Sequence, residues 1–155
     1  MLSLRKVLVP IDLSPAGMRV LEQAHTFALK FSATIDLLHV WTPPPMLAPE
    51  ALISGLGAAE QPFMEWLGNS AREHLAKFEE TARSQGIEIA GSHCELGDPA
   101  TAIVERAASG GYDLLVLGTH GRTGLSHVLM GSVAEKVVRG APCSVLTVKN
   151  RPPES

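Results

Sequence analysis

Three glycines between positions 118 and 131 have the spacing of a phosphate-binding segment. Gly118, Gly121 and Gly131 precede Ser132 in the pattern Gly-x2-Gly-x9-Gly-Ser. Glycines let the backbone come close to a ligand, and free amides at the start of a helix attract anions. A single glycine most often only makes a turn, but three at this spacing followed by serine favour phosphate binding. We therefore expect main-chain amides here to bind the phosphates of a ligand.

Residues next to these glycines could contribute to the same site. The Ser132 hydroxyl would donate to a phosphate oxygen, and the amide of Val133 would point at the same group. His120 and Arg122 could help to neutralise phosphate charge, although Arg122 could equally be a solvated loop residue. Ser132 and Glu135 also have the S-x-x-E spacing of a capping box, which predicts a helix that begins with Ser132 as its cap.

Several catalytic motifs are absent from the sequence. It contains no G-x4-G-K-[ST] of a P-loop nucleotidase and no G-x-G-x-x-G after its first apolar run. We identify no general base, arginine finger or carboxylate cluster for magnesium, so any ATP hydrolysis should be slow. The histidines and cysteines show no paired metal-ligand spacing. These residues, for which we expect neither a catalytic nor a metal-binding role, include His39, His93, Cys94, His120, His127 and Cys143.

Composition limits the class of protein. The 155 residues suit one domain, and 45% hydrophobic with 19% charged residues is ordinary for a globular chain. A net charge of -3 and 5% aromatic residues disfavour nucleic acid as a partner. No apolar run reaches membrane-spanning length, and no signal peptide is recognisable. Two distant cysteines are typical of a reduced chain, and we expect a cytoplasmic location.

Apolar runs alternate with segments of helical periodicity, which predicts an α/β fold. The first helix should begin at Ser14 and Pro15 and direct an apolar stripe that includes Phe27 and Phe31 toward the sheet. The predicted strands are residues 6–12, 34–40, 87–96, 113–117 and 143–148, and the predicted helices are 14–31, 62–85, 98–110 and 132–139.

This alternation predicts a single-domain, open parallel five-stranded sheet with helices on both faces. Ligands of such sheets bind beyond the carboxyl ends of the strands, where the strand order reverses. Pro10 and Asp12 follow the first strand, and Gly118 follows the fourth. A switch point between these two strands gives the order 3-2-1-4-5. We expect one domain over residues 1–150, with a proline-rich flexible insertion at 41–61 and a disordered tail at 151–155.

Long stretches of the chain resemble the universal stress protein family, in its ATP-binding branch. The resemblance covers residues 6–149 and includes Val7–Asp12, Gly97–Ala100, Asp113–Gly118 and the glycine signature. It implies a Rossmann-like fold of the adenine nucleotide alpha hydrolase type. It also implies ATP as the ligand, with or without Mg2+.

The same resemblance implies roles for residues outside the glycine signature. Pro10 and Asp12 would lie beside the adenosine, the backbone of Val40 would meet the adenine edge, and Leu117 would line the base pocket. From the residues alone, Asp12 could equally be a carboxylate that interacts with a helix dipole, and Leu117 an ordinary core residue.

The expected function is that of a nucleotide-dependent stress-response regulator or sensor. Two alternatives remain open: a dimeric interaction module of the same fold without functional nucleotide binding, and a slow ATPase. The last strand, Cys143–Val148, would be an exposed apolar edge, and such edges invite pairing. We therefore expect a homodimer through this strand, with a protein partner that the sequence does not identify.

Overall fold

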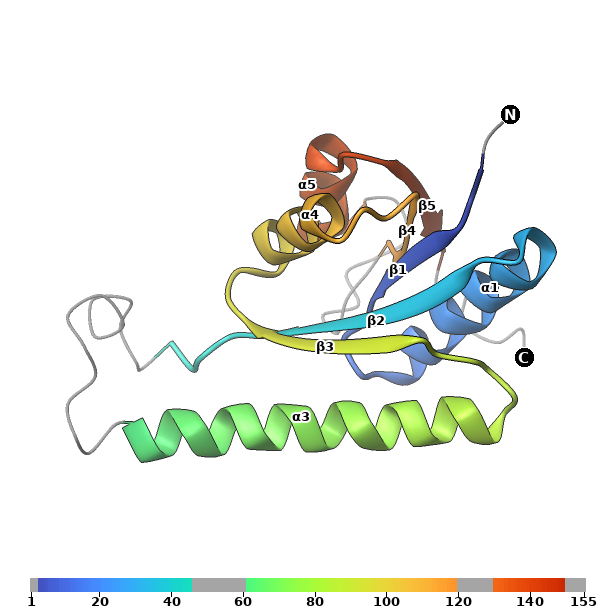
Figure 1. The fold of residues 1–155 in the computed structure, drawn as a ribbon. Helices are drawn as coiled ribbons and strands as arrows, with labels where there is room; N and C mark the ends of the chain where they lie inside the picture. Colours follow the sequence, from blue (N-terminus) through green and yellow to red (C-terminus); the bar gives the residue numbers. More distant parts are fainter. Residues whose placement is uncertain (1–2, 46–60, 120–129, 150–155) are drawn as a thin grey trace, which may run out of the picture.

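The computed structural model describes residues 3–45, 61–119 and 130–149. Strands and helices alternate along these residues, as the sequence predicts (Figure 1). The elements are β1 Lys6–Pro10, α1 Pro15–Phe31, β2 Thr34–Trp41, α3 Gln61–Ser84, β3 Gly91–Leu96, α4 Pro99–Ser109, β4 Leu114–Gly118, α5 Ser132–Gly140 and β5 Ser144–Val148. None of the described helices combines the length and hydropathy that crossing a bilayer requires.

The five strands form one sheet in the order β3-β2-β1-β4-β5, and every pairing is parallel. The predicted strand order is therefore confirmed. β1 lies in the centre, with β2 on one side and β4 on the other. The chain leaves β1 toward β2 and returns to pair β4 on the opposite side, so the order reverses between β1 and β4.

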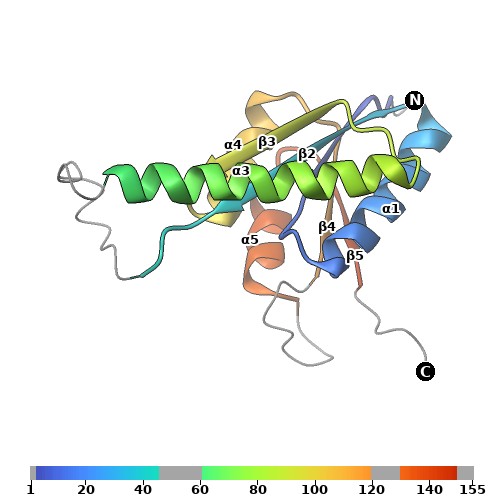
Figure 2. The ribbon, with the colours of Figure 1, turned by 90° about the horizontal axis from the view of Figure 1, so that it is seen from below.

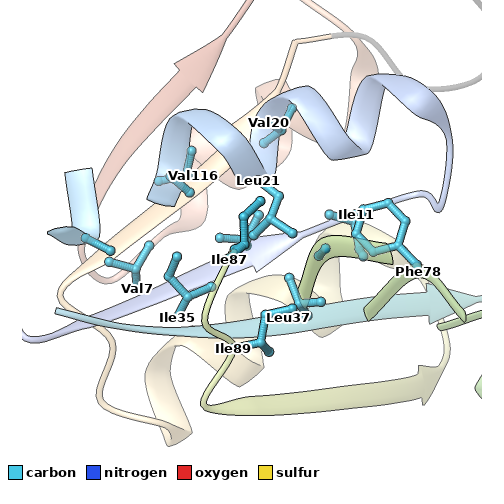
Figure 3. Close-up of a cluster of buried hydrophobic side chains, with 14 of the residues drawn as sticks. Val7, Ile11, Val20, Leu21, Ile35, Leu37, Phe78, Ile87, Ile89 and Val116 are labelled. Carbon is cyan, nitrogen blue, oxygen red and sulfur yellow. The ribbon is translucent and has the colours of Figure 1, made fainter. Parts of the chain in front are cut away.

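Each face of the sheet carries its own hydrophobic core. Successive side chains of a strand point to opposite faces, so Val7 and Val9 of β1 belong to one core and Leu8 to the other. Helices α1 and α3 cover the first face, where Val20, Leu21 and Phe78 pack on the strands (Figure 3). Helices α4 and α5 cover the second face and lie above the sheet in Figure 1. Both faces are thus buried, as a parallel sheet requires.

Two helices begin with side-chain caps. The Ser14 hydroxyl accepts a hydrogen bond from the Gly17 amide, and Pro15 follows as the first helical residue. Asp98 caps α4 by accepting from the amide and hydroxyl of Thr101. Both helix starts agree with the sequence prediction, because a short polar side chain before proline satisfies an amide that the helix leaves open.

Some sequence predictions of element bounds and faces are wrong. β3 begins at Gly91 rather than at residue 87, and β1 ends at Pro10 rather than at Asp12. Ile87 and Ile89 are buried without belonging to the strand. Phe27 and Phe31 are 37% and 49% exposed, so they lie at the margin of the α1 stripe and not against the sheet.

The predicted capping box at α5 is also wrong. Gly131 is the N-cap, with φ -60° and ψ 155°, and no side chain makes a capping bond. Ser132 is the first helical residue, one position further along than a capping box requires. The Ser132 hydroxyl is therefore not used as a helix cap.

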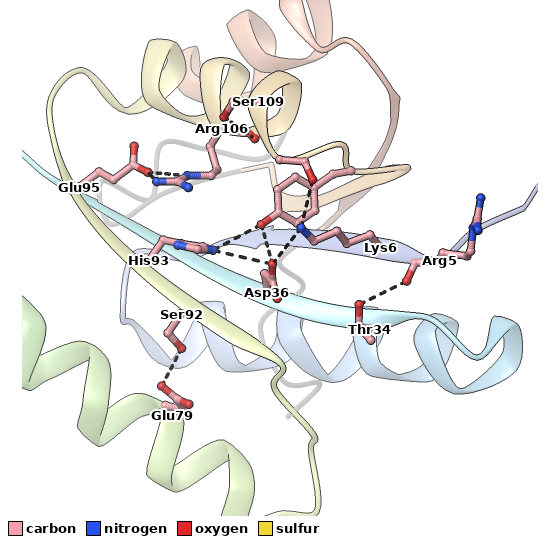
Figure 4. Close-up of polar contacts among 12 residues, drawn as sticks. Arg5, Lys6, Thr34, Asp36, Glu79, Ser92, His93, Glu95, Arg106 and Ser109 are labelled. Atoms are coloured by element: carbon pink, nitrogen blue, oxygen red, sulfur yellow. Dashed lines mark hydrogen bonds and ion pairs between the residues drawn. The ribbon is translucent and has the colours of Figure 1, made fainter.

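A buried carboxylate connects the elements on the α4 side of the sheet. Asp36 of β2 is 7% exposed and accepts a 2.6 Å hydrogen bond from the Tyr112 hydroxyl. Lys6 Nζ and His93 Nε2 each lie 3.7 Å from the same carboxylate (Figure 4). Lys6 Nζ also lies 4.4 Å from the centre of the Tyr112 ring. Asp36 pairs with Leu8 in the middle of β1 and with Gly91 at the start of β3, so this cluster lies away from the carboxyl edge.

Candidate functional site

A cavity of about 1020 Å³ lies at the carboxyl edge of the sheet. We call it the edge cavity. It spans the switch point, since residues that follow β1, end β4 and begin α5 all contribute to its lining. Eight of the predicted site residues line it: Pro10, Asp12, Val40, Leu117, Gly118, Gly131, Ser132 and Val133. The other two, Gly121 and Arg122, lie outside the described residues.

The first residues of α5 line this cavity. The first intrahelical donor of α5 is the amide of Glu135, which bonds to the Gly131 carbonyl at 3.0 Å. Ser132, Val133 and Ala134 come before that donor and line the cavity. Helix geometry leaves such amides without an intrahelical partner, and the helix dipole adds partial positive charge there. This segment suits an anion, and Ala134 is a contributor that the sequence analysis missed.

The amide of Gly131 is not available to a ligand. It donates to the Thr119 carbonyl at 2.6 Å, while the Thr119 amide donates to the Val148 carbonyl at 3.1 Å. These bonds connect the end of β4 to the start of α5 and to β5. The expectation that the Gly131 amide itself binds phosphate is therefore wrong. Its contribution is a position without a side chain beside the exposed amides of α5.

Asp12 takes part in the start of α1. Its Oδ1 accepts hydrogen bonds from the Ser14 amide at 3.0 Å and from the Ser14 hydroxyl. The interpretation of Asp12 as a carboxylate at a helix start is thus realised in the structure. The residue also lines the edge cavity and is only partly buried.

Apolar side chains line the part of the cavity beside β2 and β4. Leu117 is 4% exposed and belongs to the core under α4 and α5, and the partly buried Val40 packs against that core. Leu117 is therefore both a core residue and a lining residue. Pro99 and Ile103 of α4 add to the same apolar wall. An apolar wall next to exposed amides suits a ligand with a flat apolar part and an anionic part.

Helix α3 contributes a wall that the sequence analysis did not assign to the site. Its lining residues include the exposed His74 and Lys77, which flank the buried residues Leu75 and Phe78 of this helix. Their helical spacing relative to Leu67 and Phe78 was visible in the sequence. They carry no sequence signal of a binding site, because polar residues that flank an apolar stripe on a helix usually only face solvent.

The described groups with a shifted pKa lie outside the lining of the cavity. Hydrogen bonds from the amide and hydroxyl of Thr101 hold the pKa of the Asp98 carboxyl below its ordinary value, so it stays charged. Burial raises the pKa of the Cys94 and Cys143 thiols, which therefore stay protonated at neutral pH. No group of three or more His, Cys, Asp or Glu side chains with metal-site geometry occurs in the described residues.

Comparison with known proteins identifies related chains. The model of the universal stress protein family matches residues 3–149. Universal stress protein MJ0531 of Methanocaldococcus jannaschii is 35% identical over 147 residues, which cover 94% of this chain and 82% of that protein.

Two solved structures are similar over almost the whole chain. The structure of MJ0577, from the same organism, has a TM-score of 0.76 at 25% identity, covering 97% of this chain and 99% of that one. A universal stress protein from Archaeoglobus fulgidus in complex with dAMP has a TM-score of 0.59 at 21% identity, covering 95% and 98%. This second similarity concerns the fold alone.

Proposed function

Since this chain belongs to the universal stress protein family, we propose that its edge cavity binds an adenine nucleotide, with ATP as the expected species, and that it acts as a nucleotide-dependent regulator. One observation carries the proposal. The first residues of α5, whose amides have no partner within the helix, and the apolar wall of Val40 and Leu117 line the same cavity at the switch point. The universal stress protein from Archaeoglobus fulgidus that shares this fold was solved in complex with dAMP, an adenine nucleotide.

In this proposal the chain recognises phosphate mainly through its backbone. The amides of Ser132, Val133 and Ala134 donate to phosphate oxygens, and the Ser132 hydroxyl adds one donor. Gly118 and Gly131 let the ligand come close because they lack side chains. Val40 and Leu117 contact the base, and Pro10 and Asp12 lie beside the ribose. Gly121 and Arg122 complete the phosphate site on the strength of the sequence motif.

The proposed role is binding and regulation rather than turnover. ATP hydrolysis, with or without Mg2+, is expected to be slow because the sequence offers no identifiable general base, arginine finger or carboxylate cluster for magnesium. Measuring phosphate release at saturating ATP, with and without magnesium, tests this directly. Turnover faster than about one per second, the low end of typical enzymes, would assign the chain to the ATPases instead.

The prediction for the site is that Gly131→Val abolishes ATP binding and leaves the fold intact. The backbone of Gly131, at φ -60°, is one that valine also adopts, so folding should not suffer. The new side chain would stand beside the amides of α5 and exclude a phosphate. Isothermal titration calorimetry measures the affinity, and thermal melting followed by circular dichroism checks the fold.

Arg139→Val is the matched control, since Arg139 is exposed at the far end of the same helix. We expect this variant to bind ATP as the wild type does. Unchanged ATP affinity in a folded Gly131→Val protein would contradict the proposed site.

A second candidate function is that of a dimeric interaction module. It rests on β5, which pairs only with β4 among the described strands and leaves its other edge open. Ligand released from freshly purified protein and identified by mass spectrometry separates the two candidates. An adenine nucleotide in the released material supports the first function. Folded protein that releases no nucleotide favours the second.

A further inference from the structure

The edge cavity continues onto the face of the sheet that α1 and α3 cover. Its lining residues divide between the two hydrophobic cores, because Leu117 and Ile103 belong to one core while Val20 and Phe78 belong to the other. The proposed nucleotide site uses the edge and the face that α4 and α5 cover. We call the remainder the α1–α3 branch, and it is lined by Leu13, Met18, Val20, Ser70, His74, Lys77, Phe78 and Thr81.

This branch is long. The α3 residues that line the branch recur every three or four positions from Ser70 to Thr81, so they form one face of the helix. A helix rises 1.5 Å per residue, so this face extends about 17 Å. Figure 2 shows α3 running along the sheet. The total volume of about 1020 Å³ lies at the upper end of the range of about 300–1,000 Å³ for small-molecule sites. There is room for an occupant besides the nucleotide.

The branch has an apolar floor and a polar rim. Val20 and Phe78 are 2% and 9% exposed, and Met18 packs partly buried against the same core. His74 and Lys77 are exposed on the rim. The Thr81 hydroxyl donates to the Lys77 carbonyl at 3.0 Å, which leaves only its lone pairs for a ligand.

Lys77 gives the rim its charge. Among the lining residues within the described ranges it is the only lysine or arginine, and Asp12 at the edge is the only carboxylate. Lys77 forms no ion pair with another described residue. An acid group in the branch would therefore be attracted by Lys77 and repelled from the edge by Asp12, which fixes its orientation.

We propose that the α1–α3 branch binds an amphipathic anion, a molecule with an apolar body and one acid group, separately from the nucleotide. The body packs on Met18, Val20 and Phe78. The acid group lies against Lys77, with the His74 ring and the Ser70 hydroxyl as further hydrogen-bonding groups. A straight-chain carboxylate of six to eight carbons is the simplest molecule with this chemistry.

Calorimetric titration with sodium hexanoate, sodium octanoate and octanol tests the proposal on the wild-type protein. Octanoate should bind more tightly than hexanoate, by about fourfold for each added methylene group, because a buried methylene contributes about 0.8 kcal/mol. Octanol should bind more weakly than octanoate because it lacks the charge. Saturating ATP should leave the octanoate affinity within about twofold. Absence of octanoate binding, or complete displacement by ATP, would overturn the proposal.

Substitutions then test the residues. Lys77→Met keeps the length of the side chain and removes its charge, and we expect it to weaken octanoate binding about tenfold. Met18→Trp should fill the branch and abolish binding. Lys30→Met is the control, since Lys30 is exposed on α1 and outside the lining. All three variants are checked by thermal melting, and wild-type octanoate affinity in a folded Lys77→Met protein would overturn the proposal.

The same titrations keep this proposal apart from the nucleotide function. Octanoate binding in a protein that fails to bind ATP would support the branch and refute the nucleotide site. ATP binding without any octanoate binding would refute the branch alone.

Discussion

Tyr112 provides a residue-scale test of the polar cluster. Its hydroxyl donates to the buried Asp36, and burial together with the Asp36 carboxylate raises the pKa of Tyr112, so the hydroxyl stays protonated. Tyr112→Phe removes this bond and leaves a buried carboxylate with one donor fewer. We expect a loss of about 1–3 kcal/mol in the free energy of unfolding, measured by urea denaturation.

Thr26→Val is a control for the loss of one hydroxyl. The Thr26 hydroxyl donates to the Glu22 carbonyl on the exposed side of α1, so its removal should change stability by less than about 0.5 kcal/mol. Equal effects of the two substitutions would show that the Asp36 cluster contributes no more than a surface hydrogen bond.

Individual site residues were predictable to different degrees. Pro10, Val40 and Gly118 line the edge cavity, as the sequence and its family resemblance imply. The sequence could not reveal that the Gly131 amide donates to Thr119, because that bond depends on how β4 and α5 meet in space. It could not separate the two interpretations of Asp12 either, since the same carboxylate contacts Ser14 and lines the cavity.

The start of α4 gives an element-scale prediction. The Asp98 carboxylate caps this helix, and the Thr101 amide holds its pKa below the ordinary value of about 3.9. A lowered pKa in the folded state means that the charged cap stabilises the protein above that ordinary value. This contribution is lost as the pH falls through the lower, folded-state pKa.

Asp98→Ala should therefore cost about 1 kcal/mol of unfolding free energy at pH 7. The difference from the wild type should shrink as the pH falls below about 4, in a series of urea denaturations. Asp98→Asn is the matched variant, because asparagine caps a helix without titrating. A wild-type-to-Ala difference that stays constant down to pH 2 would contradict the assigned role of the charge.

Whole elements were more predictable than their ends. The alternation of apolar runs and helical periodicity gave the type and order of every described element, because burial on both faces requires it. The start of β3 was missed since Ile87 and Ile89 are buried apolar residues outside the strand ladder. The Ser132–Glu135 spacing predicted Ser132 as the N-cap of α5, but the N-cap is Gly131. The hydrogen bond from the Gly131 amide to the Thr119 carbonyl sets where the chain enters α5.

At the scale of the molecule, the open edge of β5 leads us to expect a homodimer. Leu146 and Val148 are only half-buried, and β5 pairs with β4 alone among the described strands. Antiparallel pairing of two β5 strands would bring the two copies of Thr147 close together. Thr147→Glu should then dissociate the dimer, because like charges on paired strands repel.

Light scattering coupled to size-exclusion chromatography measures the expected change from dimer to monomer. Ser109→Glu, which adds the same charge at the exposed end of α4, should leave the dimer intact. A wild-type protein that is monomeric at tens of micromolar would contradict this proposal.

Most of the predicted flexible insertion and the predicted disordered tail lie outside the described residues, at 46–60 and 150–155. The two ends of the predicted insertion, Trp41 and Gln61, belong to β2 and α3.

The strand order is the feature of the whole molecule that decides where a ligand can bind. It places β1 beside β4, so that the ends of both strands and the start of α5 line one cavity. The sequence predicted this arrangement because Pro10 and Asp12 follow the first predicted strand and Gly118 follows the fourth. The α1–α3 branch could not be predicted, since it arises from the packing of two helices that are distant in sequence.

Titration of ¹⁵N-labelled protein with ATP, followed by NMR, tests the central claim most directly. If backbone amides at the switch point hold the phosphates, the resonances of Gly118, Ser132, Val133 and Ala134 will shift and saturate together. Those of Thr34 and Asp113, at the opposite edge of the sheet, will stay in place. Saturable shifts confined to other parts of the chain, or no shifts at millimolar ATP, would contradict the account.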